Sequence, residues 1–368
     1  MNRPRNTCFI LVPVWLSAIL FAAPLNAQDN PSIEALQSTK RSDYVSDASH
    51  LVGTYEPTDV KHDAASMTAA AKSFLDSLDK DQRKRAALSL DDRERREWTN
   101  LPAPRNAGGV RMGDLNEAQT KLACQLLATL LSDHGYRKMR NIMLADDQLL
   151  RGGRARPGFG TENFSLVIFG EPSATEAWAF QLDGHHVGMN LAIKGDSITM
   201  APSFIGTQPH QFSIGDQKFK PFAKETGLAH KLMNSLTDDQ IKAAVLSNRR
   251  GRIVTGPGND GKTPPPQGLA CDQLDDEQKK LLTRLIAQWV NDLPKEKAKA
   301  RMKEIKGEME QMRLSWNGNK AAGSDVSYRI QSPSLIIEYA CQDLGNDPLD
   351  HLHSMYRNPK NDYGGQLK

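Results

Sequence analysis

Two blocks of sequence that each occur twice constrain the fold more than any other feature of this chain. The segment 74–82, FLDSLDKDQ, returns as LMNSLTDDQ in segment 232–240. The segment 115–122, LNEAQTKL, returns as LDDEQKKL in segment 274–281. The offsets are 158 residues from Ser77 to Ser235 and 159 residues in the second block. Because the two blocks keep nearly the same register, we interpret the chain as two diverged copies of one unit.

Each copy of each block carries the signal of a helix start. A residue that can cap a helix is followed three positions later by glutamine, which is the pattern of a capping box. The four pairs are Asp79 with Gln82, Asn116 with Gln119, Thr237 with Gln240 and Asp275 with Gln278. Apolar residues then recur at helical spacing after the second block of each half. We expect this stripe to face the core.

Strand patterns follow the helices in both halves. They cover residues 163–169 and 177–182 in the first half, and residues 326–330 and 334–339 in the second. Glycine and proline interrupt the chain at 101–104, 152–160 and 255–266. We therefore expect an α+β fold, with helices packed on antiparallel strands and the halves related by a pseudo-two-fold axis. The expected body spans 66–364 and divides into about 69–226 and about 227–364.

The N-terminus has the order of a secretory signal peptide. Arg3 and Arg5 precede an apolar run over 9–23, and Leu25 and Ala27 occupy the positions before a cleavage site. An uncleaved membrane anchor is the alternative, although the run is short for a span. We predict that residues 1–27 are removed and that the protein is exported to the periplasm or the extracellular space. Residues 28–65 are polar and aperiodic, which predicts a tether, and no later segment resembles a membrane span.

Charge and cysteine content exclude several classes of partner and leave one disulfide open. The chain has 47 basic and 44 acidic residues, so nothing predicts binding to nucleic acid or anionic lipid. Cys8 lies in the signal peptide, and Cys124 falls on an apolar helix face, where a buried thiol is expected. Cys271 and Cys341 form the candidate disulfide. The expected partner is a small-molecule or polymer substrate of unknown identity.

A glycine-rich segment at 256–261, GPGNDG, matches a dinucleotide-binding pattern only by its letters. It lies in a proline-rich connector with no helix after it, so we interpret it as a linker and expect no nucleotide cofactor.

Histidines gather after predicted strands, and their spacing suggests metal ligation. His351 and His353 would point to one face of an extended strand about 7 Å apart, within reach of one metal. His185 and His186 are adjacent, so both can ligate only at a turn or bulge. Strands 178–182 and 335–339 are interpreted as equivalent, the second followed by an insertion around 345–348, which gives each half one histidine pair. Such ligands suit zinc, copper or iron, whereas the structural alternative is a set of hydrogen-bonded core histidines.

Three further residues are candidates for catalysis. His210 follows a predicted strand, and Glu338 is placed at the position equivalent to Gln181; either is a candidate acid or base. Arg357 is a candidate for holding an anionic substrate or stabilising developing charge. A surface salt bridge for Glu338 and ordinary turn chemistry around Asn358 and Asn361 are the structural alternatives.

The leading hypothesis is an exported metal-dependent enzyme with hydrolase-type chemistry through metal-activated water. A copper or iron redox enzyme is one alternative, and a non-catalytic binding or scaffold protein is another. No established catalytic motif, such as a nucleophile elbow or a phosphate loop, is present to favour a different enzyme class.

Four stretches together resemble one bacterial family. They are 159–164 (FGTENF), 168–172 (IFGEP), 178–186 (WAFQLDGHH) and the tail 351–364. From about Ala69 to Gly364 the chain resembles the family called domain of unknown function 3500. The resemblance implies a single body and no assigned activity. The family favours aspartate after the arginine of the tail, where this chain has Asn358, which weakens a carboxylate role there.

Overall fold

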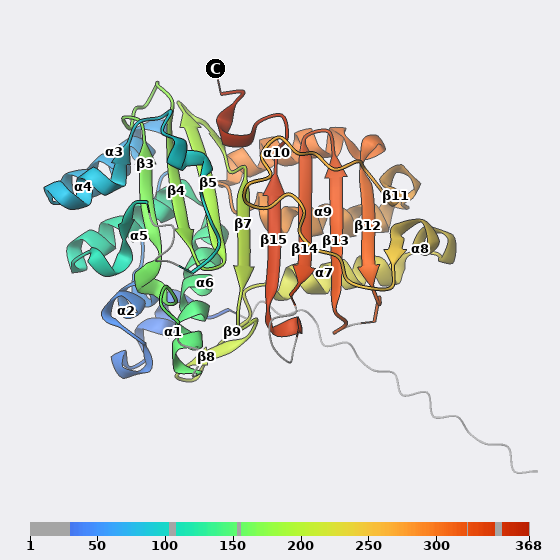
Figure 1. Ribbon diagram of the computed structural model, residues 1–368, viewed down its shortest axis with the longest axis horizontal. Coiled ribbons are helices and arrows are strands. Elements are labelled where there is room, and N and C mark those ends of the chain that lie inside the picture. Colours follow the sequence, from blue (N-terminus) through green and yellow to red (C-terminus); the bar gives the residue numbers. More distant parts are fainter. Residues whose placement is uncertain (1–29, 103–107, 153–155, 322, 343–347, 368) are drawn as a thin grey trace, which may run out of the picture.

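A computed structural model describes residues 30–102, 108–152, 156–321, 323–342 and 348–367, so the predicted signal peptide lies outside the described residues. One large sheet runs across the molecule in the order β1-β3-β4-β5-β7-β15-β14-β13-β12-β10 (Figure 1). Its first-half strands are β1 (Ala87–Leu88), β2 (Val110–Arg111), β3 (Ser165–Phe169), β4 (Trp178–Gly184), β5 (Val187–Lys194), β6 (Ser197–Thr199) and β7 (Ser203–Thr207). Its second-half strands are β10 (Val245–Ser247), β11 (Leu269–Ala270), β12 (Arg313–Gly318), β13 (Val326–Ser332), β14 (Leu335–Cys341) and β15 (Leu352–Arg357). A hairpin of β8 (Phe212–Ile214) and β9 (Gln217–Phe219) stands apart.

The long strands pair antiparallel, and the two halves join where β7 pairs with β15. At each outer edge a short strand, β1 or β10, pairs parallel with the neighbouring long strand. The four predicted strands are confirmed, with ends that differ by one or two residues. The centre of the sheet is therefore also the junction between the two parts of the chain.

Helices cover one face of this sheet, behind the strands in Figure 1. They are α3 (Ala64–Ser77), α4 (Lys80–Ala86), α5 (Glu117–Leu130), α6 (Asp133–Arg151), α7 (Ala223–Ser235), α8 (Asp238–Ala244), α9 (Asp276–Val290) and α10 (Lys295–Gly307). The apolar side chains of alternate strand positions, such as Leu182, Ile205 and Tyr356, join the helices in one core. The predicted α+β class is confirmed.

The predicted helix starts are confirmed, and their glutamines also form hydrogen bonds between neighbouring helix starts. All four capping boxes are formed, at the N-termini of α4, α5, α8 and α9. The Gln119 amide also donates to Gln82 Oε1 at 2.8 Å, and the Gln278 amide donates to Gln240 Oε1 at 2.9 Å. Each pair of glutamines thus fastens two helix starts to one another.

The segment interpreted as a polar tether is folded from Asn30 onward. It forms α1 (Ile33–Gln37) and α2 (Asp47–Thr54), and serine side chains cap both helices. Leu36 and Val52 are buried, and Ser49 donates a hydrogen bond of 2.7 Å to Asp147. A few buried apolar residues and helix caps are enough to pack this segment against α6. Its polar composition alone does not predict that it folds.

The predicted disulfide is not formed. Cys124, Cys271 and Cys341 are all free and buried. Burial raises the pKa of the Cys271 thiol to about 12, so it stays protonated and unreactive at neutral pH. Within the described residues, the helices are all too short or too polar to cross a bilayer.

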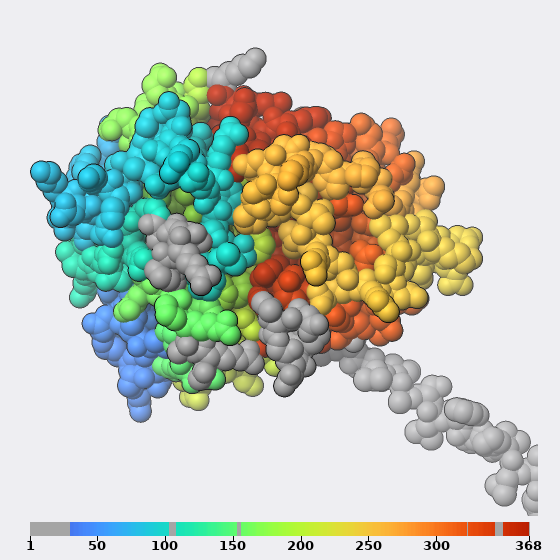
Figure 2. Space-filling view, viewed as in Figure 1, coloured from blue at the N-terminus to red at the C-terminus, as the bar shows by residue number. Residues whose placement is uncertain are grey.

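Irregular segments, and not helices, cover the second face of the sheet. Residues 89–102 cover the first half, and the connector 248–266 covers the second. Figure 2 shows this face, where C-terminal residues in red reach the surface between the teal and orange segments. The histidine pairs lie at one end of the central strands, next to the β7–β15 pairing that joins the two halves.

Candidate metal centre

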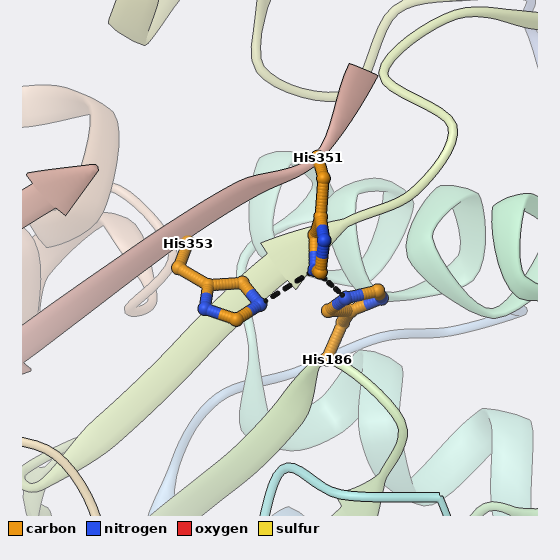
Figure 3. A group of neighbouring side chains, drawn as sticks. All are labelled: His186, His351 and His353. Carbon is orange, nitrogen blue, oxygen red and sulfur yellow. Dashed lines mark hydrogen bonds between the residues drawn. The ribbon is translucent and has the colours of Figure 1, made fainter. Parts of the chain in front are cut away.

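Three histidines from two distant parts of the chain bring their Nε2 atoms together (Figure 3). The Nε2 atom of His351 is 2.7 Å from that of His186 and 2.9 Å from that of His353. The two rings from the second half approach edge to face, with centroids 4.5 Å apart. Among the described residues, these three side chains form a group whose ligand atoms all lie within 4.8 Å of one another.

A tight turn delivers His186 to this group. His185 and His186 form the two-residue connection between β4 and β5, closed by the pair Gly184 and Val187. His186 has a φ of 70°, in the left-handed region that non-glycine residues seldom occupy. Its backbone is held on both sides, because its N–H donates to the Asn100 carbonyl and its carbonyl accepts from Gly206 N at 2.7 Å. The surrounding structure therefore maintains a strained backbone at a candidate ligand.

The other two candidate ligands lie at the beginning of β15: His351 directly precedes this strand, and His353 is its second residue. His353 lies between Ala340 on β14 and Gly206 on β7. Both neighbours are small, and the missing side chain at Gly206 leaves the space that the imidazole rings of His186 and His353 occupy. The β7–β15 pairing thus brings the His186 turn and the β15 histidines to the same place.

Burial of these side chains affects their protonation. His186 and His351 are 1% and 2% exposed, and His353 is partly exposed. Burial, followed by the charges of neighbouring histidines, holds the pKa of His186 and of His353 well below the ordinary value. Both rings are therefore neutral near pH 7 and carry the lone pair that a metal requires.

The donor set could hold a transition metal. The His351 Nε2 atom faces two other Nε2 atoms, but a single ring nitrogen offers either one N–H or one lone pair. One of the two contacts is therefore poorly satisfied by hydrogen bonding alone. A cation among three lone pairs would satisfy all of them. Nitrogen ligands of one tetrahedral metal lie about 3.3 Å apart, so the rings would separate by about half an ångström to bind it.

His185 takes a different position from the other three candidates. Its ring is stacked on Phe159, at 4.5 Å between centroids, and lies 3.7 Å from the ring of His186. Its Nδ1 atom is 2.5 Å from Asp146 Oδ1. Because a metal binds in the plane of an imidazole, a ring packed against the face of His186 is poorly placed to share the same ion. We interpret His185 as a neighbour that supports His186.

Asp146 is the functional candidate that the sequence did not predict. It lies on α6, is 1% exposed and accepts a hydrogen bond from Gly160 N at 2.6 Å. Burial raises the pKa of its carboxyl group. Together with His185 and His186 it forms a second group with ligand atoms within 4.8 Å. The only hint in the sequence is the Asp146-Asp147 pair inside an otherwise apolar turn of a helix.

The three predicted catalytic residues have other partners. His210 Nδ1 lies 3.4 Å from Asp350, next to the cluster in sequence. Glu338 Oε2 accepts hydrogen bonds from the backbone N–H groups of Val254 and Thr255 at 3.0 and 2.9 Å. Glu338 thus holds the connector, which the sequence alone predicts to be a plain linker.

Arg357 is buried, with 3% of its side chain exposed. It donates to Asp260 at 2.5 Å and to Asp362 at 3.1 Å. These contacts tie the connector and the C-terminal segment to β15.

The strand order also corrects the predicted equivalence of the two histidine pairs. His185 follows β4, the second long strand of its half, whereas His351 follows β14, the third long strand of its half. In the order of the long strands, the two pairs therefore hold different positions, and so do Gln181 on β4 and Glu338 on β14. They meet because β5, β7 and β15 are neighbours in the sheet. The insertion predicted around 345–348 lies outside the described residues except for Pro348.

Comparison with known families identifies the chain. A family model described as a protein of unknown function (DUF3500) matches residues 60–365. The chain belongs to this family. No curated protein and no solved structure matches it. The DUF3500 match spans both sheet halves and every residue of the histidine cluster, which agrees with a single body and adds no activity.

Proposed function

We propose that this DUF3500 protein binds a transition metal through His186, His351 and His353. The observation that carries the proposal is the convergence of three Nε2 atoms at 2.7 and 2.9 Å, in buried surroundings that keep the His186 and His353 rings neutral. Three imidazole ligands are typical of zinc, copper and iron sites and not of magnesium or calcium sites.

We further propose that the bound metal serves an enzyme of the hydrolase type. A transition metal held by three protein ligands acts as a Lewis acid that polarises a substrate oxygen or activates water. The partly exposed His353 marks the side from which a substrate would approach. Asp146 fixes the His185 ring, and this ring packs on His186, so the Asp146–His185 pair limits the rotation of one ligand.

Metal analysis tests this proposal directly. The mature chain is purified without any chelator, and zinc, copper and iron are measured by elemental analysis. We expect about one metal ion per chain, and less than a tenth of that in the His351→Ala/His353→Ala variant. His50→Ala removes a histidine outside the cluster and is the matched control.

The metal identity also separates the chemical alternatives. Zinc supports hydrolysis, whereas copper or iron supports the redox alternative. Protein that contains none of the three metals and takes none up on addition would rule out both. A folded protein of that kind would leave the non-catalytic binding role.

We also propose that the chain arose by duplication and has a pseudo-two-fold axis near the β7–β15 pair. Two cross-strand pairs support this interpretation. Gln181 lies opposite Asn190, and Arg329 lies opposite Glu338, 148 positions later in each case. Each pair holds its covering segment, because Gln181 donates to the Arg95 carbonyl and Glu338 accepts from residues 254 and 255. The His186 ligand has no counterpart in the other half, where Ser334 occupies the corresponding position, so a single asymmetric centre is proposed.

Export remains part of the proposed function. It rests on the basic, apolar and small-residue order of segment 1–27. N-terminal sequencing of protein recovered from a periplasmic or culture fraction is expected to begin at Gln28. Recovery of only cytoplasmic protein with Met1 intact would contradict export.

A further inference from the structure

A cleft lies on the sheet face opposite the helices, away from the histidine cluster. It has a volume of about 300 Å³ and lies between the connector at Asp260 to Thr263 and the C-terminal segment at Pro359 to Gly365. Arg357 forms part of its lining. Arg357 is four residues beyond His353 on β15, which separates the two sites by about 13 Å along the strand.

Positive charge exceeds negative charge in this cleft. Four basic residues and two acidic residues line it, an excess of two positive charges: Arg96, Lys262, Arg357 and Lys360 against Asp260 and Asp362. The chain as a whole is nearly balanced, with 47 basic and 44 acidic residues. The excess is therefore a local feature that favours an anion.

The buried guanidinium of Arg357 lies in the lining of the cleft in a fixed orientation, paired with two carboxylates. Its two terminal nitrogens are held by Asp260 and Asp362, so its orientation is set before any ligand arrives. Its Nε atom is buried and has no hydrogen-bond acceptor among the described residues. A buried donor without an acceptor costs about 1–3 kcal/mol, so an oxygen acceptor that reached this nitrogen would stabilise it.

The remaining cations are exposed and free to move toward a ligand. Lys262 is exposed, and its Nζ atom donates a hydrogen bond to Asn259 Oδ1 at 3.1 Å. Lys360 is 51% exposed on its side chain and contacts Glu308 at 3.1 Å. Arg96 is exposed and lies over the Tyr363 ring, 5.2 Å from its centroid. Ion pairs and contacts of this exposed kind are weak and easily exchanged for a ligand.

We propose that this cleft binds a small ligand through a phosphate or sulfate group. Arg and Lys side chains that converge from separate segments are typical of oxyanion sites, and an oxyanion forms charge-assisted hydrogen bonds with them. The volume is at the lower end of the range for small-molecule pockets, which suits an oxyanion with a short organic portion.

The anion site is separate from the proposed metal centre. Trp98, Phe204, Met355 and Tyr363 pack into an apolar cluster on this face of the sheet. Met355 lies between His353 and Arg357 on β15, so this cluster stands between the two sites. The anion proposal therefore does not depend on metal binding.

Thermal unfolding of the full mature chain at constant ionic strength tests the anion site. Inorganic phosphate and sulfate are each compared with chloride, and affinity is measured by calorimetric titration. We expect phosphate and sulfate to raise the melting temperature, and the Lys262→Ala/Lys360→Ala variant to bind at least about tenfold more weakly. Repeating the titration in the His351→Ala/His353→Ala background distinguishes this site from an anion bound at the metal.

The matched control is Lys242→Ala/Lys280→Ala, which removes the same charge from exposed helix positions. This control is expected to keep the full response to phosphate. Equal responses in both double variants, or equal stabilisation by chloride, would overturn the proposal. A response that disappears in the His351→Ala/His353→Ala background would also overturn it, because the anion would then belong to the metal centre.

Discussion

Gly206 and His353 lie opposite each other across the β7–β15 pair, and a β-carbon on Gly206 would stand 2.9 Å from Cδ2 of the His353 ring. The same carbon would be 3.2 Å from His186 Cδ2 and 2.6 Å from the Leu352 carbonyl oxygen. The first-half and second-half ligands can therefore approach one another only because this position has no side chain. Gly206 links the packing of the sheet centre to the geometry of the proposed site.

We expect Gly206→Ala to displace the histidine rings. The added methyl group meets backbone on one side, so the rings must move, and overpacking of this kind costs about 1–3 kcal/mol of unfolding free energy. Metal content should fall with the loss of geometry, as measured by elemental analysis beside urea denaturation. Gly307→Ala is the control, since nothing lies within 4 Å of its β-carbon. Full metal content in Gly206→Ala would contradict the close fit.

The positive φ of His186 predicts an unusual order of stability among its variants. A left-handed backbone costs an L-residue about 1–2 kcal/mol relative to glycine. We therefore expect His186→Gly to be more stable than His186→Ala in metal-free protein, while both lose the metal. At His185, where φ is not positive, we expect the opposite order. Urea denaturation of the four variants measures both differences, and the same order at both positions would argue against strain at His186.

The helix starts could be predicted from the sequence because capping is local. Asp79 and Gln82 are three residues apart, and the physical reason for their pairing lies within one helical turn. The second use of Gln82, its contact with Gln119, joins segments 37 residues apart. No local sequence pattern predicts a contact over such a distance along the chain.

The candidate site could be predicted only in part, for the same reason. The spacing of His351 and His353 predicted a shared metal, and the structure brings them together. The adjacent positions of His185 and His186 also predict that a turn is needed for His186 to take part, and such a turn is present. The register that brings β15 against β7 depends on the whole sheet. The close approach of Gly206 to the histidine rings therefore could not be predicted from sequence spacing. The same is true of the separation of Glu338 and Arg357 from the cluster.

Asp146 was missed because helix periodicity assigns charged residues to the solvent face. The α6 helix instead buries Lys138, Arg140, Asp146 and Asp147. Their partners, such as His185 and Thr161, come from elsewhere in the chain. Burial of a charged residue depends on a partner that only the fold supplies.

Asp362 predicts a measurable dependence of stability on pH. Burial, opposed by the charge of Arg357, raises the pKa of its carboxyl group to about 6. The folded state therefore holds this proton more tightly than the unfolded state, whose pKa is about 3.9. The contribution is fully present below about pH 4 and is lost as the pH rises through 6, a change of roughly 2–3 kcal/mol. Asp362→Asn should lose this part of the slope when the unfolding free energy is measured from pH 4 to pH 7, and an unchanged slope would assign it to other buried carboxyl groups.

Lys138 is expected to be essential for joining the helical layers of the two halves. Its Nζ atom lies 3.0 Å from Glu225 and 3.1 Å from Asp292, and all three side chains are buried. Burial lowers the pKa of Lys138, but the two carboxylates outweigh it and raise the net value, so the ammonium stays charged. Lys138→Met would leave two buried acids without their cation, at a cost of about 3–5 kcal/mol in urea denaturation. Lys121→Met removes an exposed lysine from an ion pair with Glu117 and should change stability by less than about 1 kcal/mol. Similar losses in the two variants would show that the buried lysine is not what holds these helices together.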